Sequence, residues 1–220
     1  RSSRSFDLLP HPRPEWSGIA RGCSHPDRDQ RRDALHDHER LAGQLRQAGI
    51  AGLESPDLGW CDGDIARFGL PERIALLVPG SSGPRLAKRW PAAQYGALAR
   101  SLADDGIASV VLGTAAEAPL AKEIARVAQA AIDLTGRTGF GDLASLARAA
   151  LLAVGNDTGP MHLIAVAGCP SLVLFSDTSD PALCAPRGDR VAILRRPSLD
   201  ALDLAPVREA ALGLLSPALV

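Results

Sequence analysis

The chain has very little lysine: only Lys88 and Lys122 occur among its 220 residues, whereas arginine is plentiful. Its formal net charge is −1, so the chain lacks the excess of basic residues typical of nucleic-acid-binding proteins. No window approaches the ~20 apolar residues that span a bilayer, and the sequence shows no secretory signal pattern. Its four cysteines lack C-x-x-C spacing, which favours a reduced, cytoplasmic protein.

The sequence patterns of several kinds of catalytic or metal site are also weak or absent. Cys23, His25, His36 and His38 carry atoms that zinc uses, but neither pair has the usual ligand spacing, so we expect no metal site. The two later histidines are better interpreted as partly exposed helix residues. Cys61 is a poor candidate nucleophile because its sequence neighbours are acidic and reactive thiolates favour electropositive surroundings. The G-x-S-x-G elbow of serine hydrolases is absent.

The first part of the chain, residues 1 to about 70, is rich in Pro, His, Asp and Arg and poor in apolar runs. Its apolar spacing predicts one amphipathic helix over residues 31–48, with Gly49 as the stop signal. This segment has too few apolar residues for a stable core of its own. The chain opens at Arg1 rather than at methionine, and we expect residues 1–70 to be the remnant of a larger N-terminal domain.

From Ile74 onward, short apolar runs alternate with helical stretches. We predict strands at residues 74–78, 109–113, 131–134, 151–154, 171–175 and 191–194. We predict helices near residues 92–104, 116–130, 141–149, 161–168 and 204–215. The stretch between Phe175 and Val191 contains Pro181 and Pro186 and is predicted to be more loop than helix. Apolar strands separated by helices indicate an α/β fold, a Rossmann-like doubly wound parallel sheet over residues 71–220.

Six strands in this rhythm fit the order 3-2-1-4-5-6, in which the first and fourth strands are neighbours and ligands bind beyond their carboxyl ends. The first strand ends in Val78-Pro79-Gly80-Ser81-Ser82-Gly83. The fourth ends in Gly155-Asn156-Asp157-Thr158-Gly159. The two loops richest in Gly, Ser and Thr are therefore expected to flank the crevice.

The first loop, residues 79–91, has the residue types that bind phosphate. Ser81 and Ser82 can donate hydrogen bonds to phosphate oxygens, and Lys88 and Arg89 supply positive charge. The loop has neither P-loop spacing nor a G-x-G-x-x-G run, so we expect no nicotinamide or flavin cofactor. The following Trp90-Pro91 is expected to pack and to start the next helix. A solvated basic loop is the alternative interpretation.

The second loop leads into a predicted helix. Pro160 suits an early helical position, and backbone N–H groups at a helix start attract anions such as phosphate. Thr158 adds a hydroxyl and His162 an imidazole, while Asp157 adds a carboxylate that can accept hydrogen bonds from sugar hydroxyls. An ordinary capped helix is the alternative.

Three motifs in this order resemble the heptosyltransferase family, glycosyltransferase family 9: Lys88-Arg89-Trp90-Pro91, Asp133-Leu134-Thr135-Gly136-Arg137-Thr138 and Asn156-Asp157-Thr158-Gly159-Pro160-Met161-His162. The resemblance covers about Ile74 to Leu194. It implies a GT-B enzyme whose C-terminal domain holds a nucleotide-diphosphate sugar, typically ADP-heptose. It also implies a lipid-linked, lipopolysaccharide-type acceptor, inverting transfer without a metal, and peripheral contact with the inner face of the inner membrane.

The resemblance further implies contacts with the donor diphosphate and sugar. Ser81, Ser82 and Lys88 would contact the diphosphate, with Lys88 stabilising the leaving group. Thr158 and Gly159 would bind the same group through hydroxyl and backbone. Asp157 would bind hydroxyls of the donor sugar, and His162 would lie against phosphate or sugar.

The nucleoside would occupy the neighbouring strand ends. By the resemblance, Thr135 and Gly136 would border the adenine. Glu117 resembles the acid that binds ribose hydroxyls, although an exposed acid in the first turn of a helix is an equally good interpretation.

The general base of the family, an aspartate in a loop of the N-terminal domain, is expected to lie outside this chain. We therefore expect the chain to bind donor and to turn over poorly or not at all. The alternatives are a nucleotide-sugar-binding module without turnover, another GT-B-like enzyme such as a sugar-nucleotide epimerase, and a structural α/β domain without a ligand. The sequence identifies neither the sugar, the base nor the acceptor.

Overall fold

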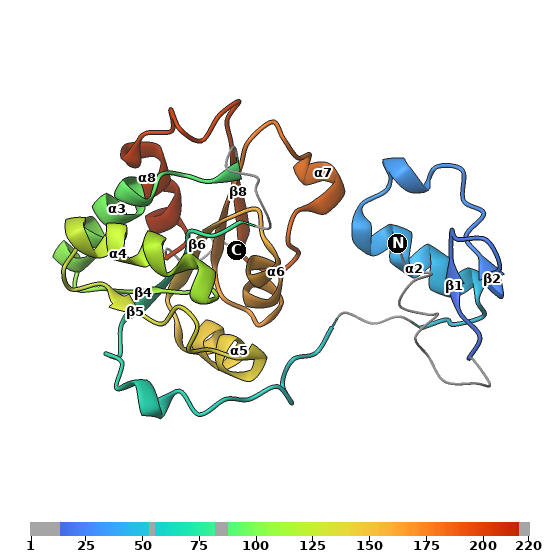
Figure 1. Ribbon diagram of the computed structural model, residues 1–220, viewed down its shortest axis with the longest axis horizontal. Helices are drawn as coiled ribbons and strands as arrows, with labels where there is room; N and C mark the ends of the chain where they lie inside the picture. The colour runs from blue at the N-terminus through green and yellow to red at the C-terminus, as the bar shows by residue number, and fades with distance from the viewer. Residues whose placement is uncertain (1–13, 53–55, 82–87, 216–220) are drawn as a thin grey trace. The chain divides into compact units, whose positions relative to one another are not determined.

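The structure, a computed structural model, describes residues 14–52, 56–81 and 88–215 (Figure 1). The chain divides into two compact units, Arg1–Ser55 with Ala182–Cys184, and Pro56–Pro181 with Ala185–Val220. Residues 56–70, which the sequence analysis grouped with the N-terminal remnant, therefore pack with the second unit.

The first unit is small. Its elements are the parallel strands β1 (Ser17–Gly18) and β2 (His25–Pro26), the 3-10 helix η1 (Arg32–Ala34) and the helix α2 (Asp37–Gln47). The helix predicted over 31–48 is thus interrupted, because Leu35 is extended at φ −92° and ψ 148°. Gly49 follows α2 with φ +81°, as its predicted stop requires. Among the described residues, no three His, Cys, Asp or Glu side chains gather as metal ligands.

The second unit is built on a six-stranded parallel sheet of order β5-β4-β3-β6-β7-β8, which confirms the predicted 3-2-1-4-5-6 arrangement. The strands are β3 (Ile74–Val78), β4 (Ala108–Val111), β5 (Ile132–Asp133), β6 (Leu152–Asn156), β7 (Ser171–Phe175) and β8 (Val191–Arg195). Every residue of β3, β6 and β7 is buried, as expected for strands covered on both faces.

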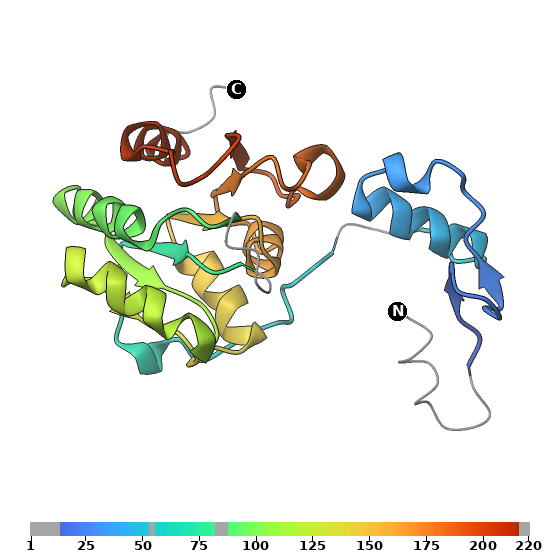
Figure 2. The same cartoon turned by 45° about the horizontal axis from the view of Figure 1, so that its top comes forward.

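Helices cover both faces of this sheet, so the doubly wound α/β fold is confirmed (Figures 1 and 2). One face carries α3 (Ala92–Asp104), α4 (Ala118–Val127) and α8 (Leu204–Gly213), and the other carries α5 (Phe140–Ala149) and α6 (Gly159–Val166). The stretch after β7 is more loop than helix, as predicted, and contains the short helix α7 (Pro181–Cys184). Proline suits the first position of that helix. No helix in the described part of the chain is long and apolar enough to cross a membrane.

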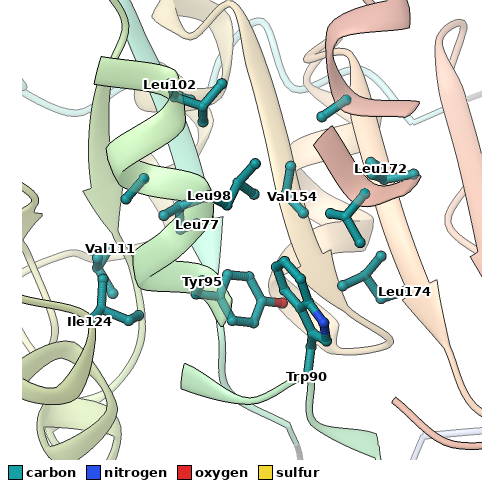
Figure 3. Close-up of a cluster of buried hydrophobic side chains, with 14 of the residues drawn as sticks. Leu77, Trp90, Tyr95, Leu98, Leu102, Val111, Ile124, Val154, Leu172 and Leu174 are labelled. Atoms are coloured by element: carbon teal, nitrogen blue, oxygen red, sulfur yellow. The ribbon is translucent and has the colours of Figure 1, made fainter. Parts of the chain in front are cut away.

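A core cluster of buried side chains lies between the sheet and the helices α3, α4 and α8 (Figure 3). Trp90 and Tyr95 pack edge to face with ring centroids 4.9 Å apart, and the Trp90 indole donates to the Leu202 carbonyl at 2.7 Å. Pro91 is the N-cap of α3. Trp90 and Pro91 therefore pack and start the helix, as predicted, and Trp90 anchors the end of the first loop in the core.

The segment before β3, residues 56–70, is tied to α5. Arg67 donates two parallel hydrogen bonds to Asp142, from Nη1 to Oδ1 at 2.8 Å and from Nη2 to Oδ2 at 2.7 Å. The Gly63 N–H donates to Ser145 Oγ at 3.0 Å. A Cβ on Gly63 would lie 2.5 Å from the Asp142 backbone nitrogen, so the close approach requires glycine.

The Arg67–Asp142 pair gives this attachment a pH dependence. The Arg67 guanidinium and the Gly139 N–H hold the pKa of the Asp142 carboxyl below its ordinary value of 3.8. Unfolding returns the carboxyl to that ordinary pKa, so the stabilisation is complete above it and is lost as the pH falls through the folded-state value. We expect the free energy of unfolding to fall more steeply below about pH 4 in the wild type than in Asp142→Asn.

Urea unfolding at a series of pH values measures this difference. Asp104→Asn removes an exposed carboxylate from α3 and is the matched control. It should retain the wild-type slope. Equal acid slopes for the wild type and Asp142→Asn would contradict the assignment.

Candidate functional site

The two loops singled out from the sequence follow neighbouring strands. Val78 of β3 pairs with Gly155 of β6, so the loops leave the sheet side by side at its carboxyl-terminal edge. A Cβ on Gly155 would lie 2.5 Å from Met161 Sδ and 2.9 Å from Val78 Cβ. Glycine at this position therefore lets α6 pack close to the strand end.

A buried ion pair joins the two loops. Lys88 Nζ lies 2.5 Å from Asp157 Oδ2, and the side chains are 7% and 9% exposed. Burying two charges is costly unless they are paired and hydrogen-bonded, and here each charge has the other as its partner. The structure thus brings together the predicted diphosphate-binding cation and the predicted sugar-binding carboxylate.

A second cation, Arg89 near the end of the first loop, reaches back to the beginning of that loop. Arg89 donates from Nε to Ser81 Oγ at 3.0 Å and from Nη2 to the Ser81 carbonyl at 3.4 Å, and Ser81 is buried. Ser82 lies outside the described residues. Arg89, which follows Lys88 in the sequence, therefore fixes the position of Ser81, the first of the two predicted phosphate-binding serines.

The side chain of Asn156, the only asparagine of the chain, holds the two loops together. It is fully buried, and its Nδ2 donates to the Pro79 carbonyl at 2.8 Å and to the Gly80 carbonyl at 3.3 Å. Its Oδ1 accepts from the Trp90 N–H at 3.0 Å and from the Tyr95 hydroxyl at 3.1 Å. This structural role of Asn156 was not predicted from the sequence. A single polar amide at the end of an apolar strand could have indicated it.

The start of α6 lies beside the ion pair in the sequence. Thr158 is the N-cap residue, with an extended backbone, and its side chain makes no capping hydrogen bond. The helix therefore does not use this hydroxyl in the way that the alternative of an ordinary capped helix assumes. Pro160 is the second residue of α6, and His162 is half-buried in its first turn.

Glu117 lies where the first loop meets the end of β4. Its Oε2 accepts from the Thr114 N–H at 2.8 Å and from the Thr114 hydroxyl at 2.6 Å, which forms a capping box. A Cβ on Gly80 would lie only 2.9 Å from Glu117 Cγ. The acid thus caps a helix and also contacts the first loop, so both interpretations of Glu117 keep a structural basis.

Thr135 and Gly136 lie at the end of β5. Gly136 has φ +72°, a conformation that glycine adopts without strain, and its N–H donates to the Gly113 carbonyl at 2.8 Å. The Thr135 hydroxyl donates to Asp133 Oδ1 at 2.7 Å within its own turn. The predicted adenine-bordering residues therefore continue the row of candidate groups along the same edge of the sheet.

The loop after β7 contributes a residue that the sequence analysis missed. Ser179 Oγ donates to Asp157 Oδ2 at 2.8 Å, the same oxygen that Lys88 contacts. No spacing in the sequence connects residues 157 and 179. Their proximity follows from β7 lying next to β6.

A hollow of about 480 Å³ lies elsewhere, between α3 and α4 at the amino end of β4. Half of its lining residues are alanines, including Ala99, Ala103 and Ala128. Ligands of doubly wound sheets bind beyond the carboxyl ends of the strands. The candidate site is therefore the row of polar groups at the opposite edge.

The fold and this row of groups define a Rossmann-like α/β domain with its polar site at the switch point of the sheet. Residues 28–203 match glycosyltransferase family 9 (heptosyltransferase), and the chain belongs to this family. It is 30% identical over 155 residues to lipooligosaccharide heptosyltransferase 2 of Haemophilus influenzae, an alignment that covers 68% of this chain and 39% of that protein.

Solved structures show the same relationship. The chain matches the ADP-heptose lipopolysaccharide heptosyltransferase II of Escherichia coli with a TM-score of 0.62 and 27% identity, over 68% of this chain and 49% of that one. It matches the Escherichia coli heptosyltransferase WaaC with ADP with a TM-score of 0.62 and 26% identity, over 80% of this chain and 55% of that one. The family resemblance inferred from the sequence is confirmed, and the chain spans about half or less of each relative.

Proposed function

We propose that this chain contains the donor-binding part of a heptosyltransferase. The enzyme would transfer heptose from ADP-heptose to a lipid-linked, lipopolysaccharide-type acceptor, with inversion at the anomeric carbon. The observation that supports the proposal most is the buried Lys88–Asp157 pair at the switch point, because a sugar-linked diphosphate would use both a cation and a carboxylate. Relatives described as an ADP-heptose enzyme and as a complex with ADP support this donor.

The proposed mechanism follows from the charge that develops. Displacement at the anomeric carbon builds negative charge on the leaving diphosphate. The Lys88 ammonium and the Gly159 N–H at the start of α6 would stabilise that charge without reorganising. The Thr158 hydroxyl, which makes no capping hydrogen bond, would be a further donor.

Asp157 would recognise the donor sugar. Both of its side-chain contacts in the described part of the chain use Oδ2, so Oδ1 can accept a hydrogen bond from a sugar hydroxyl. Ser81 would join Lys88 at the diphosphate, and His162 would lie against phosphate or sugar. Ser82 remains part of this proposal from the family resemblance alone.

The nucleoside would extend along the sheet edge toward β4 and β5. Glu117 would bind the ribose hydroxyls through the carboxylate oxygen that does not cap Thr114. Thr135 and Gly136 would border the adenine. Their positions at successive strand ends support one continuous nucleotide site.

The rest of the proposal concerns the acceptor side. We propose that the N-terminal part of the chain belongs to an acceptor-side domain, and that the acceptor brings the cytoplasmic protein to the inner face of the inner membrane. No described residue is assigned as the general base. The second candidate function is therefore a nucleotide-sugar-binding module without turnover.

Calorimetry and a transfer assay separate these possibilities. We expect the 220-residue chain to bind ADP-heptose more tightly than UDP-glucose, and to transfer little or no heptose to a heptose-deficient lipopolysaccharide acceptor. Robust transfer would favour the complete enzyme over the binding module. Failure to bind either ADP-heptose or ADP would overturn the proposed function.

A further inference from the structure

The loop that follows β7, residues 176–180, reaches the candidate site. Ser179 in this loop is half-buried, and its hydroxyl donates to Asp157 Oδ2 at 2.8 Å. Lys88 Nζ contacts the same oxygen at 2.5 Å. The carboxylate therefore has one charged partner and one neutral partner, which come from different loops.

This loop is fixed from the neighbouring strand. Arg195 of β8 pairs with Asp177 at 3.0 Å and with Asp180 at 3.9 Å, on either side of Ser179. Within the loop, the hydroxyls of Ser176 and Thr178 lie 2.6 Å apart. Ser179 thus approaches Asp157 from a backbone that has its own anchors, independent of Lys88.

Binding of a diphosphate would change which donors hold the Asp157 carboxylate. Two phosphate groups compete strongly for the Lys88 ammonium, which would then give up part of its contact with the carboxylate. A carboxylate that is 9% exposed and loses its cation is costly unless another donor holds it. The Ser179 hydroxyl is the donor already in place.

We propose that Ser179 is a positioning residue for Asp157. Its hydrogen bond keeps Oδ2 occupied when Lys88 turns toward the diphosphate, and so keeps Oδ1 directed to a hydroxyl of the donor sugar. Ser179 therefore supports recognition of the sugar and has little effect on binding of the nucleotide diphosphate alone. This inference rests on the proposed function, because it takes Asp157 as the sugar contact.

The test compares two probes, ADP and ADP-heptose, by calorimetry on the full chain. Ser179→Ala should leave the dissociation constant for ADP near the wild-type value and weaken binding of ADP-heptose by roughly tenfold, the effect of losing one hydrogen bond to a charged group. Ser179→Thr retains the hydroxyl and should restore the preference for ADP-heptose. Ser176→Ala removes a buried hydroxyl of the same loop that bonds to Thr178 rather than to Asp157, and should keep that preference.

The possible results separate this inference from the proposed function. A wild-type preference that survives in Ser179→Ala would overturn the role of Ser179. Equal weakening of both probes would also overturn it, because that pattern reports a distorted loop or a lost phosphate contact. If the wild-type chain bound neither probe, the proposed function itself would fail.

Discussion

Replacing Lys88 with alanine is expected to weaken the binding of ADP to the chain by roughly 10- to 100-fold, the scale of losing one hydrogen bond between charged groups. The loss should appear in binding because the ammonium would contact the diphosphate already in the ground state, and any residual heptose transfer should fall with it. The effect should be large because Lys88 is one of only two lysines, and the other, Lys122, is exposed on α4.

The measurement is the ADP affinity of Lys88→Ala by calorimetry, with Lys122→Ala as the matched control. Lys88→Ala also leaves the buried Asp157 carboxylate without its cation, which destabilises the fold. The double variant Lys88→Ala/Asp157→Asn removes that uncompensated charge and should still bind ADP weakly. Unaltered ADP affinity in Lys88→Ala would show that the first loop does not bind the diphosphate.

Asn156→Ala should lower the free energy of unfolding by about 3–5 kcal/mol, since each buried group left without a partner costs about 1–3 kcal/mol. The groups concerned are the Pro79 carbonyl and the Trp90 N–H, each of which hydrogen-bonds to the Asn156 side chain. A domain is stable by only about 5–15 kcal/mol. The variant should therefore be marginally folded, with both loops displaced from the site.

Urea unfolding followed by tryptophan fluorescence measures this loss. Tyr95→Phe is the graded control, because it removes one donor to Asn156 Oδ1 and leaves the Trp90 N–H in place. It should cost about 1 kcal/mol. If the free energy of unfolding fell no more in Asn156→Ala than in Tyr95→Phe, the Asn156 side chain would not hold the two loops together.

The central strands could be predicted closely from the sequence. β3 and β7 have the predicted bounds, because each is a run of five residues that proline or polar residues limit at both ends. The strand order followed from the alternation of strands and helices, since the handedness of parallel connections leaves few arrangements. The same reasoning placed the two loops at one edge of the sheet.

Contacts between loops could not be predicted in this way. Ser179 contacts Asp157 through the pairing of β6 with β7, and Asn156 collects partners from residues 79, 80, 90 and 95. Such hydrogen bonds depend on three-dimensional neighbours rather than on spacing. The capping box of Thr114 and Glu117 is different: its T-x-x-E pattern was visible in the sequence and predicts the observed bonds.

The account depends on a nucleotide sugar binding where β3 and β6 end. An NMR titration of the ¹⁵N-labelled chain with ADP-heptose tests this most directly. We expect saturable shifts in the amides of Lys88, Asp157, Thr158 and Gly159, with little change at Ser109 beside the hollow between α3 and α4. Shifts confined to that hollow, or no shifts at all, would contradict the account.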